Sequence, residues 1–169
     1  MKNIILIGMP GAGKSTVGVV LAKMLGYRFM DSDLVIQEKT GKLLSELIEE
    51  NGDAGFIQIE NDINKAIEVE KTVIATGGSA VYGKEAMEHF KETGIVVYLS
   101  VPFDEISERV GNLHKRGVVA NGKSTIEEIF DERVSLYEKY ADVVIDADEA
   151  SVREVAVKIL SCKELENKL

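Results

Sequence analysis

The sequence has one cysteine, two histidines and no tryptophan. A single cysteine, Cys162, forms neither a disulfide within the chain nor a cysteine cluster for a metal. His89 and His114 are too few for a typical zinc site. The apolar run near the N-terminus is short and is broken by Gly8 and Pro10, so it is neither a signal peptide nor a transmembrane helix. We therefore expect a cytoplasmic protein with no membrane partner.

Positive charge is also scarce, since 20 Lys and Arg residues face 29 Asp and Glu residues and the net charge is −9. A surface of that sign repels phosphate backbones, which argues against a general nucleic-acid partner. The 169 residues, 45% of them hydrophobic, are expected to form one domain, residues 1–169. A core of that size needs no disulfide or structural metal to be stable.

Short apolar runs alternate with longer amphipathic stretches along the chain. The runs, which resemble buried parallel strands, are residues 4–7, 29–30, 72–75, 95–99 and 143–145. Helical spacing or capping signals predict helices over residues 17–25, 43–50, 54–69, 84–93, 103–112 and 124–140, and after residue 151. This alternation predicts a three-layer α/β/α fold with a five-stranded parallel sheet and a ligand at the carboxyl ends of its strands.

Three local signals refine this prediction. Asn51-Gly52 is a stop signal between the second and third predicted helices, residues 43–50 and 54–69. Ser124 with Glu127, and Ser151 with Glu154, match the capping box at a helix start. Residues 113–123 have little apolar periodicity, so we expect a mobile lid there.

The strongest motif is GMPGAGKST, residues 8–16, which fits G-x-x-x-x-G-K-[ST]. It follows a predicted strand and opens a predicted helix, which is the context that gives the motif its meaning. Glycines let the backbone wrap closely around phosphate, and the helix start adds a positive dipole end. Lys14 should reach the β- and γ-phosphates of ATP, and the Ser15 hydroxyl should bind Mg²⁺.

A phosphate loop of this kind usually works with an acidic group at a strand end. Asp31 and Asp33 follow the second predicted strand, and Asp146 follows the fifth. Two carboxylates at i, i+2 suit metal binding by Asp31 and proton transfer by the other. Helix capping is the alternative interpretation of this pair. Asp146 fits the end of an edge strand equally well, so we favour Asp31 and Asp33 as the acidic groups beside the phosphate loop.

At this point the sequence resembles the shikimate kinase family, over residues 1–146. The segments that carry the resemblance, besides the phosphate loop, are FMDSD (29–33), GDAGFIQIE (52–60), VIATGGS (73–79), Arg109 with Arg116, RVSLY (133–137) and the Ala141-Asp142 pair. Their order and spacing follow the family pattern. The resemblance implies a nucleoside-monophosphate-kinase-like fold with a closing lid, and transfer of the ATP γ-phosphoryl group to the 3-hydroxyl of shikimate. We therefore expect a monomer that acts on a small-molecule substrate.

The resemblance also implies roles for particular residues. The expected ATP-binding set is Gly11, Ala12, Gly13, Lys14, Ser15, Thr16 and Arg109, the last on the adenine side. Asp33 would contact substrate hydroxyls and act as the base, and Arg116 would be the lid arginine near the γ-phosphate. The expected substrate-binding set is Asp33, Gly77, Gly78, Ser79 and Arg133, where Arg133 holds the carboxylate.

Two departures from the family pattern fall in the acceptor half. Ile57 stands where the family has an arginine that shares the substrate carboxylate, although its partner Glu60 is present. Ser79 stands at the third glycine of T-G-G-G, where a side chain narrows the pocket and is strained if φ is positive. Three alternatives stay open: shikimate as acceptor, a paralogous kinase for another hydroxylated metabolite, and a nucleotide-binding regulatory module without turnover.

Overall fold

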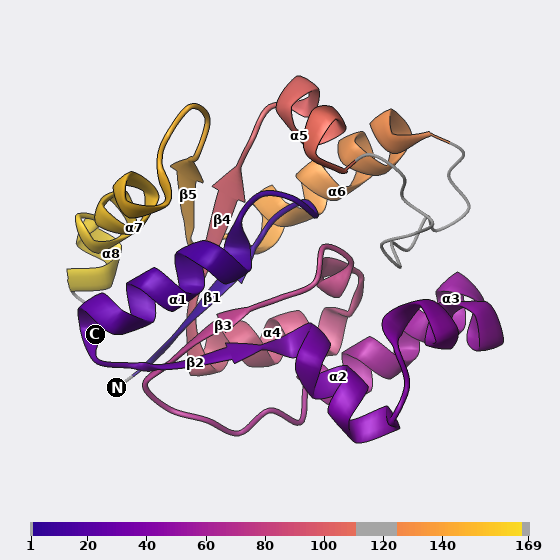
Figure 1. Ribbon diagram of the computed structural model, residues 1–169. Helices are drawn as coiled ribbons and strands as arrows, with labels where there is room; N and C mark the ends of the chain where they lie inside the picture. Colours follow the sequence, from indigo (N-terminus) through magenta and orange to yellow (C-terminus); the bar gives the residue numbers. More distant parts are fainter. Residues whose placement is uncertain (1, 111–124, 167–169) are drawn as a thin grey trace.

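The computed structural model describes residues 2–110 and 125–166. Its centre is a parallel sheet of five strands in the order β2-β3-β1-β4-β5 (Figure 1). The strands are β1 (Asn3–Ile7), β2 (Arg28–Asp31), β3 (Thr72–Ala75), β4 (Gly94–Ser100) and β5 (Val143–Asp146). The prediction of a five-stranded parallel sheet is confirmed, and each strand lies within one or two residues of its expected place.

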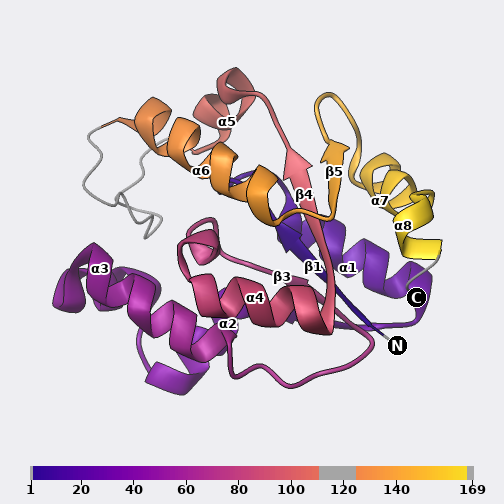
Figure 2. The same ribbon diagram turned by 180° about the vertical axis from the view of Figure 1, so that it is seen from behind.

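Helices cover both faces of the sheet, which gives the three expected layers. Helices α1 (Lys14–Leu25), α7 (Val152–Leu160) and the short α8 (Lys163–Glu166) lie on one face, and α4 (Lys84–Thr93) and α6 (Ile126–Tyr140) lie on the other (Figures 1 and 2). The remaining elements are α2 (Ser32–Thr40), α3 (Leu44–Asn64), the 3-10 turn η1 (Ala80–Tyr82) and α5 (Phe103–Val110). None of the described helices is long and apolar enough to span a bilayer.

The core follows from the apolar runs. Strand β1 lies in the middle of the sheet and every one of its residues is buried, as is every residue of β3. Strand β5 lies at the edge and alternates buried and exposed residues, so Val144 is 55% exposed. The inner strands are continuous apolar runs because both of their faces are covered by helices, although the apolar run of β5 shows that such a run also occurs at the edge.

A smaller apolar cluster holds helices α2 and α3 together beyond the β2 edge of the sheet (Figure 1). Ile36, Leu47 and Phe56 are its buried centre, and Ile57 packs against it. The Ile57 side chain therefore contributes to the apolar packing between α2 and α3. Because this cluster is separate from the main core, helices α2 and α3 form a distinct wall beside the phosphate loop.

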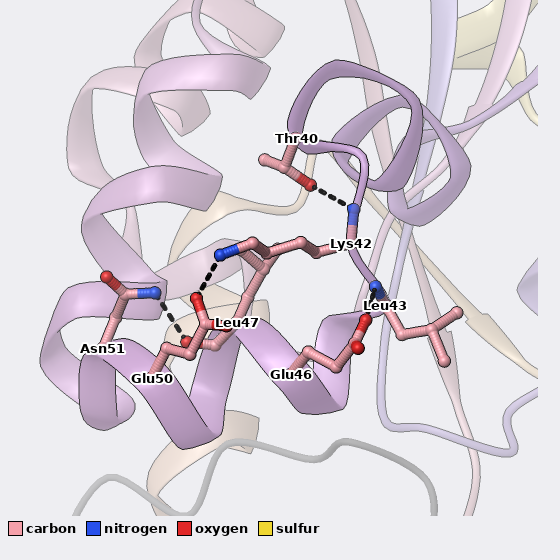
Figure 3. Close-up of polar contacts among 7 residues, drawn as sticks. All are labelled: Thr40, Lys42, Leu43, Glu46, Leu47, Glu50 and Asn51. Atoms are coloured by element: carbon pink, nitrogen blue, oxygen red, sulfur yellow. Dashed lines mark hydrogen bonds and ion pairs between the residues drawn. The ribbon is translucent and has the colours of Figure 1, made fainter.

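Polar contacts also hold the connection between α2 and α3 in place (Figure 3). The Glu46 carboxylate accepts a hydrogen bond from the Leu43 backbone N–H at 2.7 Å, at the start of α3. The Lys42 ammonium pairs with the Glu50 carboxylate one turn further along. Helix α2 carries little apolar periodicity, and the sequence did not predict it.

Two predicted helix boundaries are wrong. The stop at Asn51-Gly52 is present as a break inside α3, where Gly52 has φ 70° and ψ 174°, but the helix ends at Asn64 and not at residue 69. Helix α6 is capped by Thr125, whose hydroxyl accepts from the Glu128 N–H at 3.2 Å. The sequence places two hydroxyl residues before two glutamates, so both registers fit the capping pattern. The predicted Ser151–Glu154 box is confirmed.

Candidate active site

The phosphate loop joins β1 to α1 at the carboxyl end of the sheet. Gly11 and Gly13 have φ of 82° and 88°, a region that side-chain-bearing residues rarely adopt. Ala12 is buried between them and donates its N–H to the Met9 carbonyl at 3.1 Å. Gly13, a fixed glycine of the motif, and Gly11, at one of its variable positions, are therefore both needed for the shape of the loop, which opens directly into the N-terminus of α1.

Lys14 is buried inside this loop, with 7% of its surface exposed. Its ammonium donates to the carbonyls of Gly8 and Met9, each at 2.8 Å. Burial lowers the pKa of Lys14 to about 8, although the carboxylates of Asp33 and Asp31 oppose the shift. The loop thus holds a cation ready for an anionic group, at the position expected for the β- and γ-phosphates.

Ser15 and Asp31 meet beside the loop. The Ser15 hydroxyl donates to the Asp31 carboxylate at 2.7 Å, and the other Asp31 oxygen accepts from the Asp33 N–H at 3.0 Å. Asp31 is therefore the N-cap of α2, as the capping interpretation proposed, and it also lies against the hydroxyl that the motif assigns to a metal. A hydroxyl and a carboxylate suit Mg²⁺, which takes few protein ligands when phosphates and waters supply the rest.

Within residues 2–110 and 125–166, no group of three or more His, Cys, Asp and Glu side chains forms a metal cage. Asp146, the alternative acidic residue, lies at the end of edge strand β5 and its carboxylate accepts from the Asp148 N–H at 2.9 Å. The structure therefore places Asp31 and Asp33, and not Asp146, at the phosphate loop.

Asp33 faces the backbone of the segment that follows β3. Burial raises the pKa of the Asp33 carboxyl to about 6, the nearby Asp31 raises it further, and Lys14 opposes both. A Cβ atom on Gly77 would lie 2.6 Å from an Asp33 oxygen, which explains the glycine by lack of space. A carboxylate with a raised pKa suits proton transfer near neutral pH.

Arg133, on helix α6, approaches the segment that follows β3 at Gly78, next to the glycine that faces Asp33. It is fully buried, and its guanidinium carbon is 5.4 Å from the centre of the Tyr82 ring. A Cβ atom on Gly78 would lie 2.9 Å from an Arg133 nitrogen. Tyr137, one turn further along α6, donates its hydroxyl to the Gly78 carbonyl at 2.5 Å. Helix α6 thus brings the Arg133 guanidinium to the site, and its Tyr137 hydroxyl holds Gly78 in place.

Glu60 and Ser79 form a hydrogen-bonded pair in the wall between these groups. The Ser79 hydroxyl donates to the Glu60 carboxylate at 2.7 Å, and both side chains are buried. Ser79 has φ −93°, so the serine in place of glycine carries no left-handed strain. Ser79 lines the cavity, and its hydroxyl holds the buried Glu60 carboxyl in place.

Arg109 lies at the outer side of the phosphate loop. Its guanidinium donates to the Gly11 carbonyl at 3.0 Å and pairs with Glu105 at 3.0 Å. The side chain is thus placed against the loop that the sequence assigned to nucleotide. Arg116 and the predicted lid, residues 113–123, lie outside the residues that the structure describes, so their expected roles stay predictions.

A cavity of about 330 Å³ joins these groups into one site. Its lining combines the phosphate loop, the acidic start of α2, the segment after β3 and Arg133. Four residues that were not expected as site residues also line it, Pro10, Leu44, Phe56 and Thr76, although all but Leu44 lie in the quoted motif segments. Apolar and small residues carry no chemical signature of their own, and only the placement of the elements brings them to the cavity.

A phosphate loop after the first strand, this strand order, and an acceptor pocket with a buried carboxylate and arginine define a P-loop kinase that acts on a small molecule. The family model for shikimate kinase matches residues 10–164. Shikimate kinases from Thermodesulfovibrio yellowstonii and Clostridium botulinum are 41% and 40% identical, over 95% and 86% of this chain and 94% and 88% of theirs.

Solved structures give the same answer. A shikimate kinase from Acinetobacter baumannii in complex with shikimate is 35% identical, with a TM-score of 0.87 over 100% of this chain and 96% of that one. A shikimate kinase from Aquifex aeolicus is 34% identical, with a TM-score of 0.82 over 98% and 97% of the two chains. The chain belongs to the shikimate kinase family. It is a phosphotransferase that acts on a hydroxyl group and takes its phosphate from ATP.

Proposed function

We propose that this protein transfers the γ-phosphoryl group of ATP to the 3-hydroxyl of shikimate. The observation that carries the proposal is the meeting of the Lys14 loop with Asp33, Gly77 and Arg133 in a single cavity. The relatives named above support it, because they are shikimate kinases and one of them is solved with shikimate. We further propose that the protein is a single-domain, monomeric, cytoplasmic enzyme without nucleic-acid or membrane partners.

In this reaction the 3-hydroxyl oxygen forms a bond to the γ-phosphorus while the bond from that phosphorus to the β–γ bridging oxygen breaks. ADP leaves with the bridging oxygen. Asp33 accepts the hydroxyl proton, for which its raised pKa suits it. Lys14 and the backbone N–H groups of the loop stabilise the charge on the phosphates.

We assign the remaining groups to binding. Ser15 and Asp31 hold Mg²⁺, which neutralises phosphate charge when it is bound. Gly77 and Gly78 offer backbone N–H groups to the acceptor, Ser79 lines its pocket, and Arg133 pairs with its carboxylate. On the nucleotide side, Gly11 to Thr16 cradle the phosphates, Arg109 lies beside the adenine, and Arg116 approaches the γ-phosphate.

The decisive test is ADP release with shikimate at millimolar concentration, with the phosphorylated product identified by mass spectrometry. The matched control pair is Lys14→Ala and Lys23→Ala, which remove one cation inside the loop and one exposed cation at the end of α1. Loss of one preorganised charge at the phosphates lowers kcat by about 10²–10³. We expect this loss in Lys14→Ala alone, with both variants folded. Substantial turnover by folded Lys14→Ala would contradict the phosphate-loop role.

A second candidate acceptor rests on Ile57, which takes away one of the two arginines that the family places on the substrate carboxylate. A paralogous kinase for a hydroxylated metabolite without a carboxylate fits a pocket with Arg133 alone. The same ADP-release assay with a panel of small polyols distinguishes the two. Turnover of a polyol with no turnover of shikimate would favour the paralogue, and nucleotide binding without any turnover would favour a regulatory module.

A further inference from the structure

The last turn of helix α5 packs against the outer side of the phosphate loop. A Cβ atom on Gly11 would lie 3.2 Å from the Arg109 Cβ and 3.6 Å from a methyl carbon of Val110. Ile106 and Val110 anchor the helix, because both side chains are fully buried. Helix α5 is therefore a firm base beside the loop, and the Arg109 side chain extends from it.

The Arg109 guanidinium holds one particular peptide group of the loop. Its Nη1 donates to the Gly11 carbonyl at 3.0 Å. The N–H of the same peptide group belongs to Ala12 and donates to the Met9 carbonyl at 3.1 Å, so both ends of this planar unit are held. The Met9 carbonyl also accepts from the Lys14 ammonium at 2.8 Å. A continuous series of contacts thus joins the guanidinium on α5 to the lysine inside the loop.

Glu105, one turn earlier on α5, fixes the guanidinium that makes this contact. Its Oε1 accepts from the Arg109 Nε at 3.0 Å and pairs with Nη2 at 3.0 Å. The Glu105 and Arg109 side chains are 40% and 37% exposed, and an ion pair in such a place adds little to stability. A carboxylate beside a loop that binds polyphosphate also repels the ligand. Neither stability nor charge therefore explains the acid, whereas the orientation of Arg109 does.

We propose that Glu105 is a positioning residue for nucleotide binding, which acts through Arg109 on the shape of the phosphate loop. With the guanidinium held, the peptide group between Gly11 and Ala12 is oriented before ATP arrives. Without Glu105, binding must immobilise the Arg109 side chain, at a cost that corresponds to roughly two- to ten-fold in affinity. This inference rests on the part of the proposed function that places the ATP phosphates on the Lys14 loop, and it is independent of the acceptor.

Two ligands separate an effect on the loop from an effect on the base of ATP. Isothermal titration calorimetry measures the Kd of Mg-ATP and of Mg-tripolyphosphate for wild type and Glu105→Met. Methionine keeps the length of the side chain but cannot accept the guanidinium hydrogen bonds. We expect both Kd values to rise by the same factor, roughly two- to ten-fold, because tripolyphosphate has no base and meets only the loop. The Tm of the free variant should stay close to that of wild type.

Three further variants test how Glu105 acts. Glu105→Gln keeps an oxygen that accepts from the guanidinium, so it should restore part of the affinity. Asp104→Asn removes an exposed carboxylate from the same first turn of α5, and it should leave both Kd values unchanged or slightly lowered. In an Arg109→Met background, Glu105→Met should have no further effect on either Kd, because the residue through which it acts is gone.

The sign of the change in Kd decides between positioning and charge. Tighter binding of tripolyphosphate by Glu105→Met would show that the carboxylate acts only through its charge, and a rise in Kd confined to ATP would place the effect at the base. Unchanged Kd values, or a wild type that binds ATP but not tripolyphosphate, would show that no preorganised loop depends on Glu105. Each of these results would overturn the proposal, whereas failure of wild type to bind ATP would refute the proposed function itself.

Discussion

Ile57 stands where the resemblance to the family leads us to expect an arginine. Its side chain packs on the small α2–α3 cluster, and Glu60 lies one helical turn further along the same helix. We expect Ile57→Arg to lower the KM for shikimate by roughly ten-fold, because a second guanidinium would add one charged hydrogen bond to the carboxylate. The expected change in kcat is small. Steady-state kinetics of the two proteins measure both constants.

The first control makes Ile57→Arg in a chain that already carries Glu60→Met. In Glu60→Met the new guanidinium would be buried without a carboxylate partner, so the gain in KM should be lost and the unfolding free energy should fall. Ile57→Met, which adds no charge, should leave the KM unchanged. If the natural acceptor has no carboxylate, Ile57→Arg will not improve its KM at all. Improved binding of a neutral polyol by this variant would refute the electrostatic explanation.

The raised pKa of Asp33 and the lowered pKa of Lys14 predict a bell-shaped pH profile. A base works only when it is deprotonated, so kcat/KM for the acceptor should fall ten-fold per pH unit below about 6. A phosphate-binding lysine works only when it is protonated, so kcat/KM for ATP should fall above about 8. An unperturbed aspartate would move the acid limb to about 4, because its usual pKa is near 3.9. Initial rates from pH 5 to 9, with the fold checked by circular dichroism, measure both limbs.

At the residue scale, the sequence predicted which side chains lie together in the site but not which hydrogen bonds they make with one another. Lys14, Ser15 and Asp33 carry recognisable motif positions, and the structure brings them together. The spacing of Asp31 and Asp33 already fitted helix capping, but that Asp31 also accepts from Ser15 depends on the tertiary placement of β2 beside α1, which no spacing reveals. The pairing of Ser79 with Glu60 joins residues nineteen positions apart on different elements, so only the tertiary placement shows it.

At the element scale, the break at Gly52 shapes the wall that carries Glu60. With φ 70° and ψ 174°, Gly52 lies in a region that is open almost only to glycine. A Cβ atom there would meet nothing within 4 Å, so substitution costs only backbone strain. We expect Gly52→Ala to lower the free energy of unfolding by about 1–3 kcal/mol. Urea denaturation, followed by circular dichroism, measures this difference.

Gly26, at the C-terminal end of α1, is the matched control. It has the same φ of 70°, but its ψ of 28° lies in the left-handed helical region, and its Cβ position is also open. Gly26→Ala should therefore cost less, about 1 kcal/mol. Equal losses in the two variants would show that the ψ of Gly52 is not what demands glycine there.

The elements that the sequence predicted best are those whose burial pattern is unambiguous. The inner strands are continuous apolar runs, and helix α4 lies at its predicted residues 84–93. Helix α2 was missed because only Ser32 and Ile36 of its nine residues are buried, which leaves no apolar periodicity to detect. The end of α3 was placed too late because residues 65–69 continue the apolar pattern after the helix has ended.

At the scale of the whole molecule, strand order explains how distant motifs form one site. Strand β1 lies between β3 and β4, so the phosphate loop that follows β1 ends next to the Thr76–Ser79 segment that follows β3. Strand β2 lies beyond β3 and delivers Asp31 and Asp33 to the same edge. A parallel sheet makes this convergence necessary once the order is given, but the sequence alone does not state the order.

Because the site is built from these separate parts of the fold, a nucleotide that binds there should stabilise the whole chain. A ligand at 100 times its Kd that binds only the folded state adds about 2.7 kcal/mol, which for a chain of this length raises Tm by about 5–10 °C. We expect that rise with ATP and Mg²⁺, and a smaller one with ATP and EDTA, since Ser15 and Asp31 would then hold no metal. Lys14→Ala should lose most of it. Differential scanning fluorimetry measures each case, and equal shifts with and without Mg²⁺ would argue against the Ser15–Asp31 metal site.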